Sequence, residues 1–253
     1  MRYVRPFDVS GLEKGLCADW LLGPGDAAGV SIRLRRGGSD VAPTACTGVE
    51  RYALVIEGEA RLLGGGQREQ DQLARSGELI FIPAGLAAAV TGDGDAIWAE
   101  IEAPLAGGPQ AGEGFEARVI PVDQSRFEGQ GFAYQSLVDR KAGAQTLRMN
   151  VLQVQPGAGS PDYHIHAFAQ IYLIQEGEMT VDIGRTRLIA ARNSLVYLPA
   201  GVVHRNFNAS GAVERHVSLL VPEPREGAIF DFAVTIHDKE AELLKEIPGR
   251  YDG

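Results

Sequence analysis

Cysteine is scarce in this sequence, and long apolar runs are missing from it. The 253 residues include only Cys17 and Cys46, which lie far apart. This excludes a disulfide framework and a CxxC redox or zinc site. No stretch approaches the roughly 18–20 consecutive apolar residues that a membrane-spanning helix needs. The first residues, Met1–Asp8, contain no apolar run of the kind that a secretory signal carries. We therefore expect a cytoplasmic protein with no membrane partner.

Basic charge is also scarce, and so is helical patterning. The chain has 24 Lys and Arg against 33 Asp and Glu, which gives a formal net charge of −9. A protein that binds duplex nucleic acid normally presents a basic face, so nucleic acid is not an expected partner. The clearest helical pattern is Asp238–Ile247, where Asp238 can cap the first turn. We expect one short C-terminal helix there.

Glycine and proline, in contrast, are abundant. The 32 glycines and 13 prolines separate short apolar runs, for example 147–155, 170–175, 179–183 and 194–198. Short runs rich in β-branched residues, with turn residues between them, are typical of a β-sandwich or a closed barrel. We interpret Glu176-Gly177-Glu178 as the corner of a hairpin between two such runs. The sequence predicts an all-β protein.

The chain also repeats itself. Three pairs of similar segments occur in the same order in both halves: Pro6–Ser10 with Pro121–Ser125, Leu54–Glu59 with Leu173–Glu178, and Ile80–Gly85 with Val196–Gly201. The offset between partners varies only from 115 residues (121 − 6) to 119 residues (176 − 57), which small loop insertions explain. We therefore predict two domains, at 1–105 and 115–222. A Gly-, Pro- and Ala-rich linker at 106–114 joins them, and a tail with the short helix follows at 223–253.

All five histidines lie in the second half, at positions 164, 166, 204, 216 and 237. On a strand, His164 and His166 point to the same face because side chains alternate with period two. Gln170 follows at the next strand, and His204 follows the turn Pro199–Gly201. Three imidazoles and one amide oxygen that converge suit a divalent ion such as Mn, Fe, Co, Ni or Zn. We predict a metal site formed by His164, His166, Gln170 and His204.

The segments around these residues resemble the two motifs of the cupin superfamily. The pattern His-x-His-x3-Gln-x6-Gly, which begins at His164, is similar to the first motif, in which two His and one Glu bind a metal. The pattern Pro-x-Gly-x2-His-x-Asn, which begins at Pro199, is similar to the second. The resemblance covers nearly all of both repeats and implies two double-stranded β-helix (jelly-roll) barrels. Gln170 departs from the family pattern, in which Glu is usual.

The first repeat does not retain these residues. The repeat offsets place its equivalent positions at Ala45, Thr47, Arg51 and Ala88. None of them can replace the set in the second repeat, and the charge of Arg51 would oppose a cation. We therefore predict a first barrel without metal and one metal ion per chain.

Several kinds of cupin share parts of this arrangement. A degenerate first barrel followed by a metal-binding second one is similar to the layout of the ureidoglycine aminohydrolases. The ligand set is similar to that of small cupins that open unsaturated ketouronates. Cupin dioxygenases use the same barrel with three His, often with Glu. These resemblances imply a metal-dependent activity and name no substrate.

A neutral ligand set leaves the full charge of a divalent ion in the pocket. Such a site favours a small anionic, chelating metabolite, namely a hydroxy or keto acid, a sugar acid or a ureido compound, on which the metal acts as a Lewis acid. Tyr172, His216 and Arg148 are the candidates for catalysis and carboxylate binding. Two alternatives stay open: a cupin dioxygenase, and a cupin that binds metal or a small ligand without catalysis.

We also expect a homodimer or a higher homo-oligomer, through exchange of residues 1–10, because exposed sheet edges favour pairing.

Overall fold

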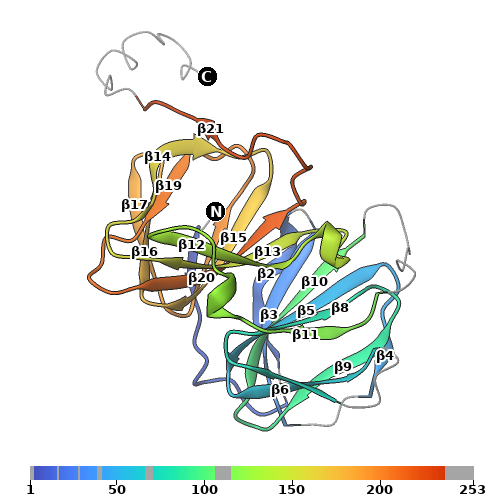
Figure 1. The fold of residues 1–253 in the computed structure, drawn as a ribbon. Helices are drawn as coiled ribbons and strands as arrows, with labels where there is room; N and C mark the ends of the chain where they lie inside the picture. The colour runs from blue at the N-terminus through green and yellow to red at the C-terminus, as the bar shows by residue number, and fades with distance from the viewer. Residues whose placement is uncertain are drawn as a thin grey trace, which may run out of the picture.

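The computed structural model describes residues 3–15, 17–27, 29–38, 42–65, 71–105 and 115–236. Within these ranges the chain is built almost entirely of antiparallel strands (Figure 1). The helices described are two single 3₁₀ turns, η1 (Gln124–Arg126) and η2 (Arg140–Ala142), and neither could cross a membrane. The all-β prediction is confirmed. The predicted linker 106–114, His237 and the predicted helix Asp238–Ile247 lie outside the described residues.

The strands form four sheets, which make two barrels. In the first barrel, the six-stranded sheet has the order β11 (Arg118–Ile120), β8 (Leu79–Ile82), β5 (Val49–Glu57), β10 (Ile97–Pro104), β3 (Val30–Arg36), β2 (Cys17–Ala27). The four-stranded sheet has the order β4 (Thr44–Ala45), β9 (Ala87–Gly92), β6 (Glu59–Gly64), β7 (Gln72–Arg75).

The second barrel repeats this plan. Its six-stranded sheet has the order β1 (Val4–Pro6), β18 (Ser194–Leu198), β15 (Ala169–Glu176), β20 (Glu214–Val221), β13 (Arg148–Val154), β12 (Phe132–Val138). Its five-stranded sheet has the order β17 (Thr186–Ala191), β16 (Glu178–Ile183), β19 (His204–Phe207), β14 (Gly159–Ile165), β21 (Phe232–Ala233). The segment Glu176–Glu178 joins β15 to β16, which belong to different sheets. It is therefore a corner between sheets, and the hairpin interpretation was wrong.

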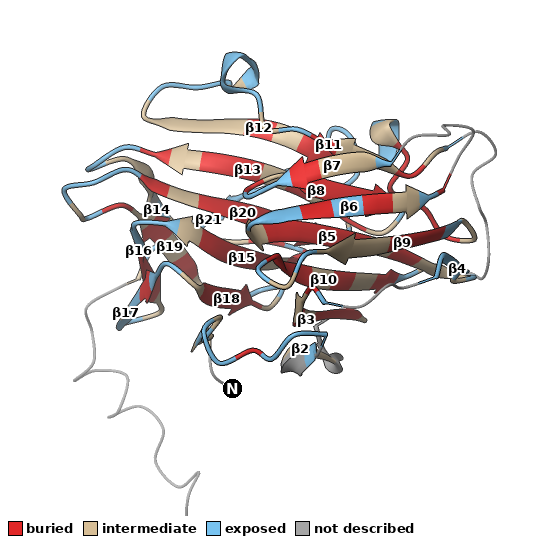
Figure 2. Ribbon diagram, turned by 90° about the horizontal axis from the view of Figure 1, so that it is seen from below, coloured by how far each residue is buried: buried red, intermediate tan, exposed pale blue. Residues whose placement is uncertain are grey.

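The strands β5 and β15 are buried on both faces, which explains their continuous apolar sequences. In β15, Ile171 and Leu173 belong to a core that contains residues of both six-stranded sheets. Tyr172 and Ile174, which alternate with them, belong to the core inside the second barrel. Figure 2 shows the same near-continuous burial along β5, β8 and β15. The two barrels therefore share one apolar core between their larger sheets.

The first strand of each repeat pairs with the other barrel. Val4 of β1 lies opposite Val196 in β18 of the second barrel. The equivalent strand of the second repeat, β11, pairs with the first barrel, with Val119 opposite Ile80. Both strands lead to the same local structure, because Asp8 and Asp123 each accept a hydrogen bond from the backbone amide of the Ser two residues later. The exchange that we expected between two copies thus occurs for residues 4–6 within one chain.

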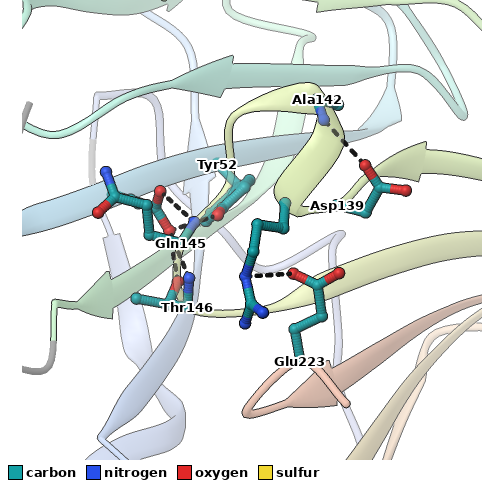
Figure 3. A network of polar contacts seen from close by, with 8 residues as sticks. Tyr52, Asp139, Ala142, Gln145, Thr146 and Glu223 are labelled. Atoms are coloured by element: carbon teal, nitrogen blue, oxygen red, sulfur yellow. Dashed lines mark hydrogen bonds and ion pairs between the residues drawn. The ribbon is translucent and has the colours of Figure 1, made fainter. Parts of the chain in front are cut away.

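A buried carboxylate also links the barrels. Glu50 of β5 is fully buried and accepts hydrogen bonds from the backbone amides of Gln145 and Thr146, at 2.8 and 3.2 Å. It also accepts hydrogen bonds from the Thr146 hydroxyl and from the Tyr52 hydroxyl. Figure 3 shows Tyr52, Gln145 and Thr146 gathered around this group. Burial, and then the Glu50 charge, raises the pKa of Tyr52 well above its usual value.

Candidate metal centre

Three histidine side chains meet in the second barrel. His164 lies near the end of β14, His166 follows just after this strand, and His204 begins β19 directly opposite His164. Each offers a ring nitrogen, and these nitrogens lie within 4.8 Å of one another. The ring centroids are 4.4–4.9 Å apart. All three side chains are buried. The structure therefore brings together the three histidines that the two motifs single out.

Hydrogen bonds to the backbone fix the orientation of these rings. The Nδ1 atoms of His164, His166 and His204 lie 2.8, 2.9 and 3.0 Å from the carbonyl oxygens of Asp162, Phe230 and Val202. A carbonyl oxygen can only accept, so each Nδ1 carries the proton and each Nε2 offers its lone pair.

The Nε2 atoms of His166 and His204 are buried and have no hydrogen-bond partner. Burial also lowers the pKa of His204 to about 4, which keeps this ring neutral at neutral pH. Neutral imidazoles with free, buried lone pairs are suitable ligands for a divalent metal ion, so the residues present fit such an ion.

Gln170 lies at the same pocket, on the inward face of β15 with Tyr172. Its Oε1 atom is buried and has no hydrogen-bond partner. A buried carbonyl oxygen without a donor costs about 1–3 kcal/mol, which a metal ion or its bound water would offset. The predicted role of Gln170 as the fourth ligand stays a prediction.

Asp231 lies next to the histidines, and sequence reasoning missed it. Its Oδ1 atom is 3.2 Å from His166 Nδ1, and the hydrogen bond from His166 lowers the pKa of Asp231. Asp231 belongs to the segment after the repeats, where β21 pairs with β14. The residue before it, Phe230, packs edge-on against Phe168. Asp231 has no counterpart in the repeat and belongs to no motif, so no sequence signal pointed to it. Its charge would partly balance a cation held by the histidines.

A cavity of about 340 Å³ lies beside the three-histidine cluster and is lined by His164 and His166. The three residues predicted for catalysis and carboxylate binding all line it. Arg148 Nε donates to Asn150 Oδ1 at 3.1 Å, and the ring of Tyr172 packs edge-on against His216 at 4.9 Å. Burial raises the pKa of Tyr172, so its phenol stays protonated. Four aromatic side chains also line it: Phe132, Tyr134, Phe168 and Phe230.

Arg205, between His204 and Asn206, is not a lining residue of this cavity. Its Nε donates to Asp182 Oδ2 at 2.9 Å, and its guanidinium lies over the Tyr163 ring. Asp182 is buried and also accepts two hydrogen bonds from Arg187. Hydrogen bonding from Arg187 is the main cause that lowers the pKa of Asp182, and hydrogen bonding from Arg205 lowers it further. The alternation of β19 therefore directs Arg205 to this ion pair.

The equivalent place in the first barrel holds an arginine side chain. Arg51 Nη2 lies 2.9, 3.4 and 3.0 Å from the carbonyl oxygens of Thr44, Leu86 and Ala88. The positions equivalent to the histidines are Ala45, Thr47 and Ala88, and no cluster of metal-ligating side chains is found among the described residues of this barrel. A guanidinium that donates to carbonyls there would repel a metal ion.

Comparisons with known proteins identify the fold. Residues 150–218 match the family model described as "Cupin domain". A "Cupin 2 conserved barrel domain protein" from Leptotrichia buccalis has a TM-score of 0.64 at 14% identity, over 87% of this chain and 98% of that one. No curated protein matches the chain by sequence.

Two enzymes are also among the similar structures. Oxalate decarboxylase of Bacillus subtilis, which has Mn(II) centres, has a TM-score of 0.56 at 12% identity, over 81% of this chain and 71% of that one. Salicylate 1,2-dioxygenase of Pseudoaminobacter salicylatoxidans has a TM-score of 0.61 at 11% identity, over 79% and 73%. At these identities the likeness concerns the fold alone.

Proposed function

We propose that this chain, which is similar to cupins in its fold and over residues 150–218, is a two-barrel cupin enzyme that uses one divalent metal ion on a small anionic, oxygen-rich metabolite. The observation that carries the proposal is the fixed orientation of three imidazoles, whose ring nitrogens lie within 4.8 Å of one another beside a cavity lined by His164 and His166. His164, His166 and His204 would hold the ion, with Gln170 as the fourth ligand. An ion held there would act as a Lewis acid on a carbonyl or carboxylate oxygen.

The remaining pocket residues supply binding and orientation. Arg148 is the cation of the cavity wall, and its planar guanidinium suits the carboxylate of a hydroxy or keto acid, a sugar acid or a ureido compound. Phe168 stacks on the ring of His166 and packs edge-on against Phe230, so aromatic rings cover one side of His166. Tyr172 stays protonated and can donate a hydrogen bond into the cavity. His216 offers a ring nitrogen as an acceptor.

Metal analysis tests the first part of the proposal. Protein purified without a histidine tag should contain about one divalent ion per chain, as expected for one closed ligand set. His204→Ala should lose the ion, whereas His216→Gln should retain it, because His216 lies outside the three-histidine cluster. Wild-type protein that binds no divalent ion would refute the proposal.

Turnover assays test the second part. Hydroxy acids, keto acids, sugar acids and ureido compounds should be assayed with the metal-loaded protein, with the chelated protein and after return of the ion. Turnover that follows the ion supports the proposal. Binding of these acids without turnover would favour a non-catalytic binding protein.

A dioxygenase is the second candidate, because three imidazole ligands also suit a redox-active ion. This candidate predicts consumption of oxygen with diphenols and with Fe, Mn or Ni as the bound ion. Turnover without oxygen, supported by Zn, would exclude it. An oxygen electrode and metal exchange therefore distinguish the two chemistries.

A further inference from the structure

A second group of polar atoms lies in the cavity, away from the metal ligands. His216 and Ser218 stand on β20 and line the cavity, and both side chains are buried. His216 Nε2 and Ser218 Oγ have no hydrogen-bond partner. Each such atom costs about 1–3 kcal/mol when it is left without a partner in the interior. Two of them on one wall point to a ligand that supplies their hydrogen bonds.

The carboxylate of Glu214 contacts the ring of His216 on this wall. Both oxygens of Glu214 lie 2.9 Å from His216 Nδ1, and both side chains are almost completely buried. An ionised carboxylate can only accept, so Nδ1 carries the proton. In the neutral ring Nε2 is then a hydrogen-bond acceptor, on a side chain that lines the cavity. A ligand group that satisfies it must bring a proton.

Strand pairing places this group deep in the barrel. Gln170 lies opposite Leu220, Tyr172 opposite Ser218, and Ile174 opposite His216. From Leu220 to His216 the strand advances four residues, which is about 13 Å along β20. Ser218 lies two residues, about 7 Å, from Leu220, so a ligand that contacts the three histidines and this group must extend along β20.

The first barrel has lost this group together with the metal ligands. Trp98 lies opposite Val55, as His216 lies opposite Ile174 in the second barrel. Glu100 lies opposite Ala53, as Ser218 lies opposite Tyr172. The barrel that holds Arg51 in place of a metal ligand thus also lacks the polar pair. The two sets of residues occur together in the one barrel, which is expected if they bind the same molecule.

We propose that His216 and Ser218 form a subsite for a hydroxyl group of the metabolite, with Glu214 as the positioning residue. The hydroxyl donates to His216 Nε2 and accepts from Ser218 Oγ. The ligand is therefore an acid that carries its metal-binding oxygens at one end and a hydroxyl group farther along its chain. This inference rests on the proposed function, because the metal-binding end is taken from it.

Nitrogen NMR of the wild-type protein tests the role of Glu214 without any ligand. In Zn-loaded protein with ¹⁵N-labelled histidine, His216 should show a protonated Nδ1 and an unprotonated Nε2, assigned with His216→Gln. Glu214→Gln keeps the side-chain size, yet its amide can also donate, so the protonated nitrogen should change or become mixed. A wild-type His216 with its proton on Nε2 would overturn the proposal.

Binding of matched acids tests the subsite. Calorimetry of Zn-loaded protein should compare unbranched 2-oxo acids of four to ten carbons with the same acids bearing a terminal hydroxyl. For at least one chain length, the hydroxyl should tighten binding by about tenfold or more. His216→Leu should abolish this preference, so that the plain and the hydroxylated acid of each chain length bind this variant with affinities that agree within about threefold. Metal content and melting temperature serve as controls of folding.

The outcomes separate the two proposals. If the plain acids bind and no hydroxylated acid binds more tightly, the subsite is refuted and the proposed function stands. If a preference survives in His216→Leu, the subsite is likewise refuted. If no acid of either series binds the metal-loaded protein, the proposed function fails, and the subsite fails with it.

Discussion

Arg51 and Gln170 occupy equivalent positions in the two barrels: Arg51 lies opposite Ile82 and Glu102, and Gln170 opposite Leu198 and Leu220. In the first barrel the guanidinium donates to three backbone carbonyls. In the second the amide oxygen is buried without a partner. The first barrel thus carries a positive charge on the Arg51 side chain, at the position where we propose that the second barrel binds a metal ion.

Arg51→Gln should therefore destabilise the protein without creating a metal site. The carbonyls of Leu86 and Ala88 would lose a charged donor, which is expected to lower the free energy of unfolding by about 1–3 kcal/mol. Metal content should stay that of the wild type. Arg61→Gln, on the exposed side of β6, should change stability by less than about 0.5 kcal/mol. Urea unfolding and elemental analysis measure both effects. A second bound ion in Arg51→Gln would contradict the prediction.

Gln170→Glu should move two affinities in opposite directions. The added negative charge should tighten metal binding on the order of tenfold, because an anionic oxygen attracts a dication more strongly than an amide does. The same charge should weaken binding of an anionic ligand. Calorimetry with the metal and then with a 2-oxo acid measures both. Gln153→Glu adds the same charge away from the cavity lining and should change neither. Unchanged affinities in Gln170→Glu would leave a three-histidine site.

The ion pairs of Asp182 predict a loss of stability in acid. Arg187 and Arg205 lower the pKa of Asp182 in the folded state below its unfolded value of about 3.9. The stabilisation is therefore present above about pH 4 and is lost as the pH falls through the lower, folded pKa. Asp182→Asn should be less stable than the wild type at pH 7, and this difference should shrink as the pH falls below 4. Calorimetric melting from pH 7 to pH 2.5 would show it. A difference that does not depend on pH would refute the assignment.

Glu50→Gln should weaken the attachment between the barrels. The carboxylate accepts hydrogen bonds from Gln145, Thr146 and Tyr52 in a fully buried place, and an amide accepts with one oxygen only. We expect a loss of about 2–4 kcal/mol in the free energy of unfolding. Glu226→Gln removes an exposed partner of Lys141 and should cost less than about 1 kcal/mol. Equal effects of the two substitutions in urea unfolding would contradict this ranking.

The oligomeric state is still a prediction. Residues 4–6 pair with β18 of the same chain in this structure, and their exchange with another copy stays a prediction. Light scattering at micromolar concentration should detect a dimer or a larger assembly. A monomer under these conditions would refute the prediction.

Sequence patterns predicted what is local or repeated, and missed what depends on the path of the chain. His164 and His166 follow from the period of a strand, and the turn before His204 marks the next motif. The repeat indicated two barrels, and it indicated that Arg51 of the first barrel stands at the position of Gln170 in the second. Asp231 lies beyond both repeats, and only the pairing of β21 with β14 brings it to His166. Glu214 precedes His216 by two residues, but its orienting role required knowledge of burial.

The crossing of β1 and β11 between barrels has a consequence for how the chain could be divided. A polypeptide ending before position 106 would contain β1 without the edge of β18, and would expose β8 without β11. The complementary polypeptide would contain β11 without the edge of β8, and would expose β18 without β1. Each half thus carries a strand that only the other half can accept. Produced separately, the halves should aggregate or remain unfolded, whereas production together should reunite them as one complex, as two subunits of a strand-swapped dimer would be.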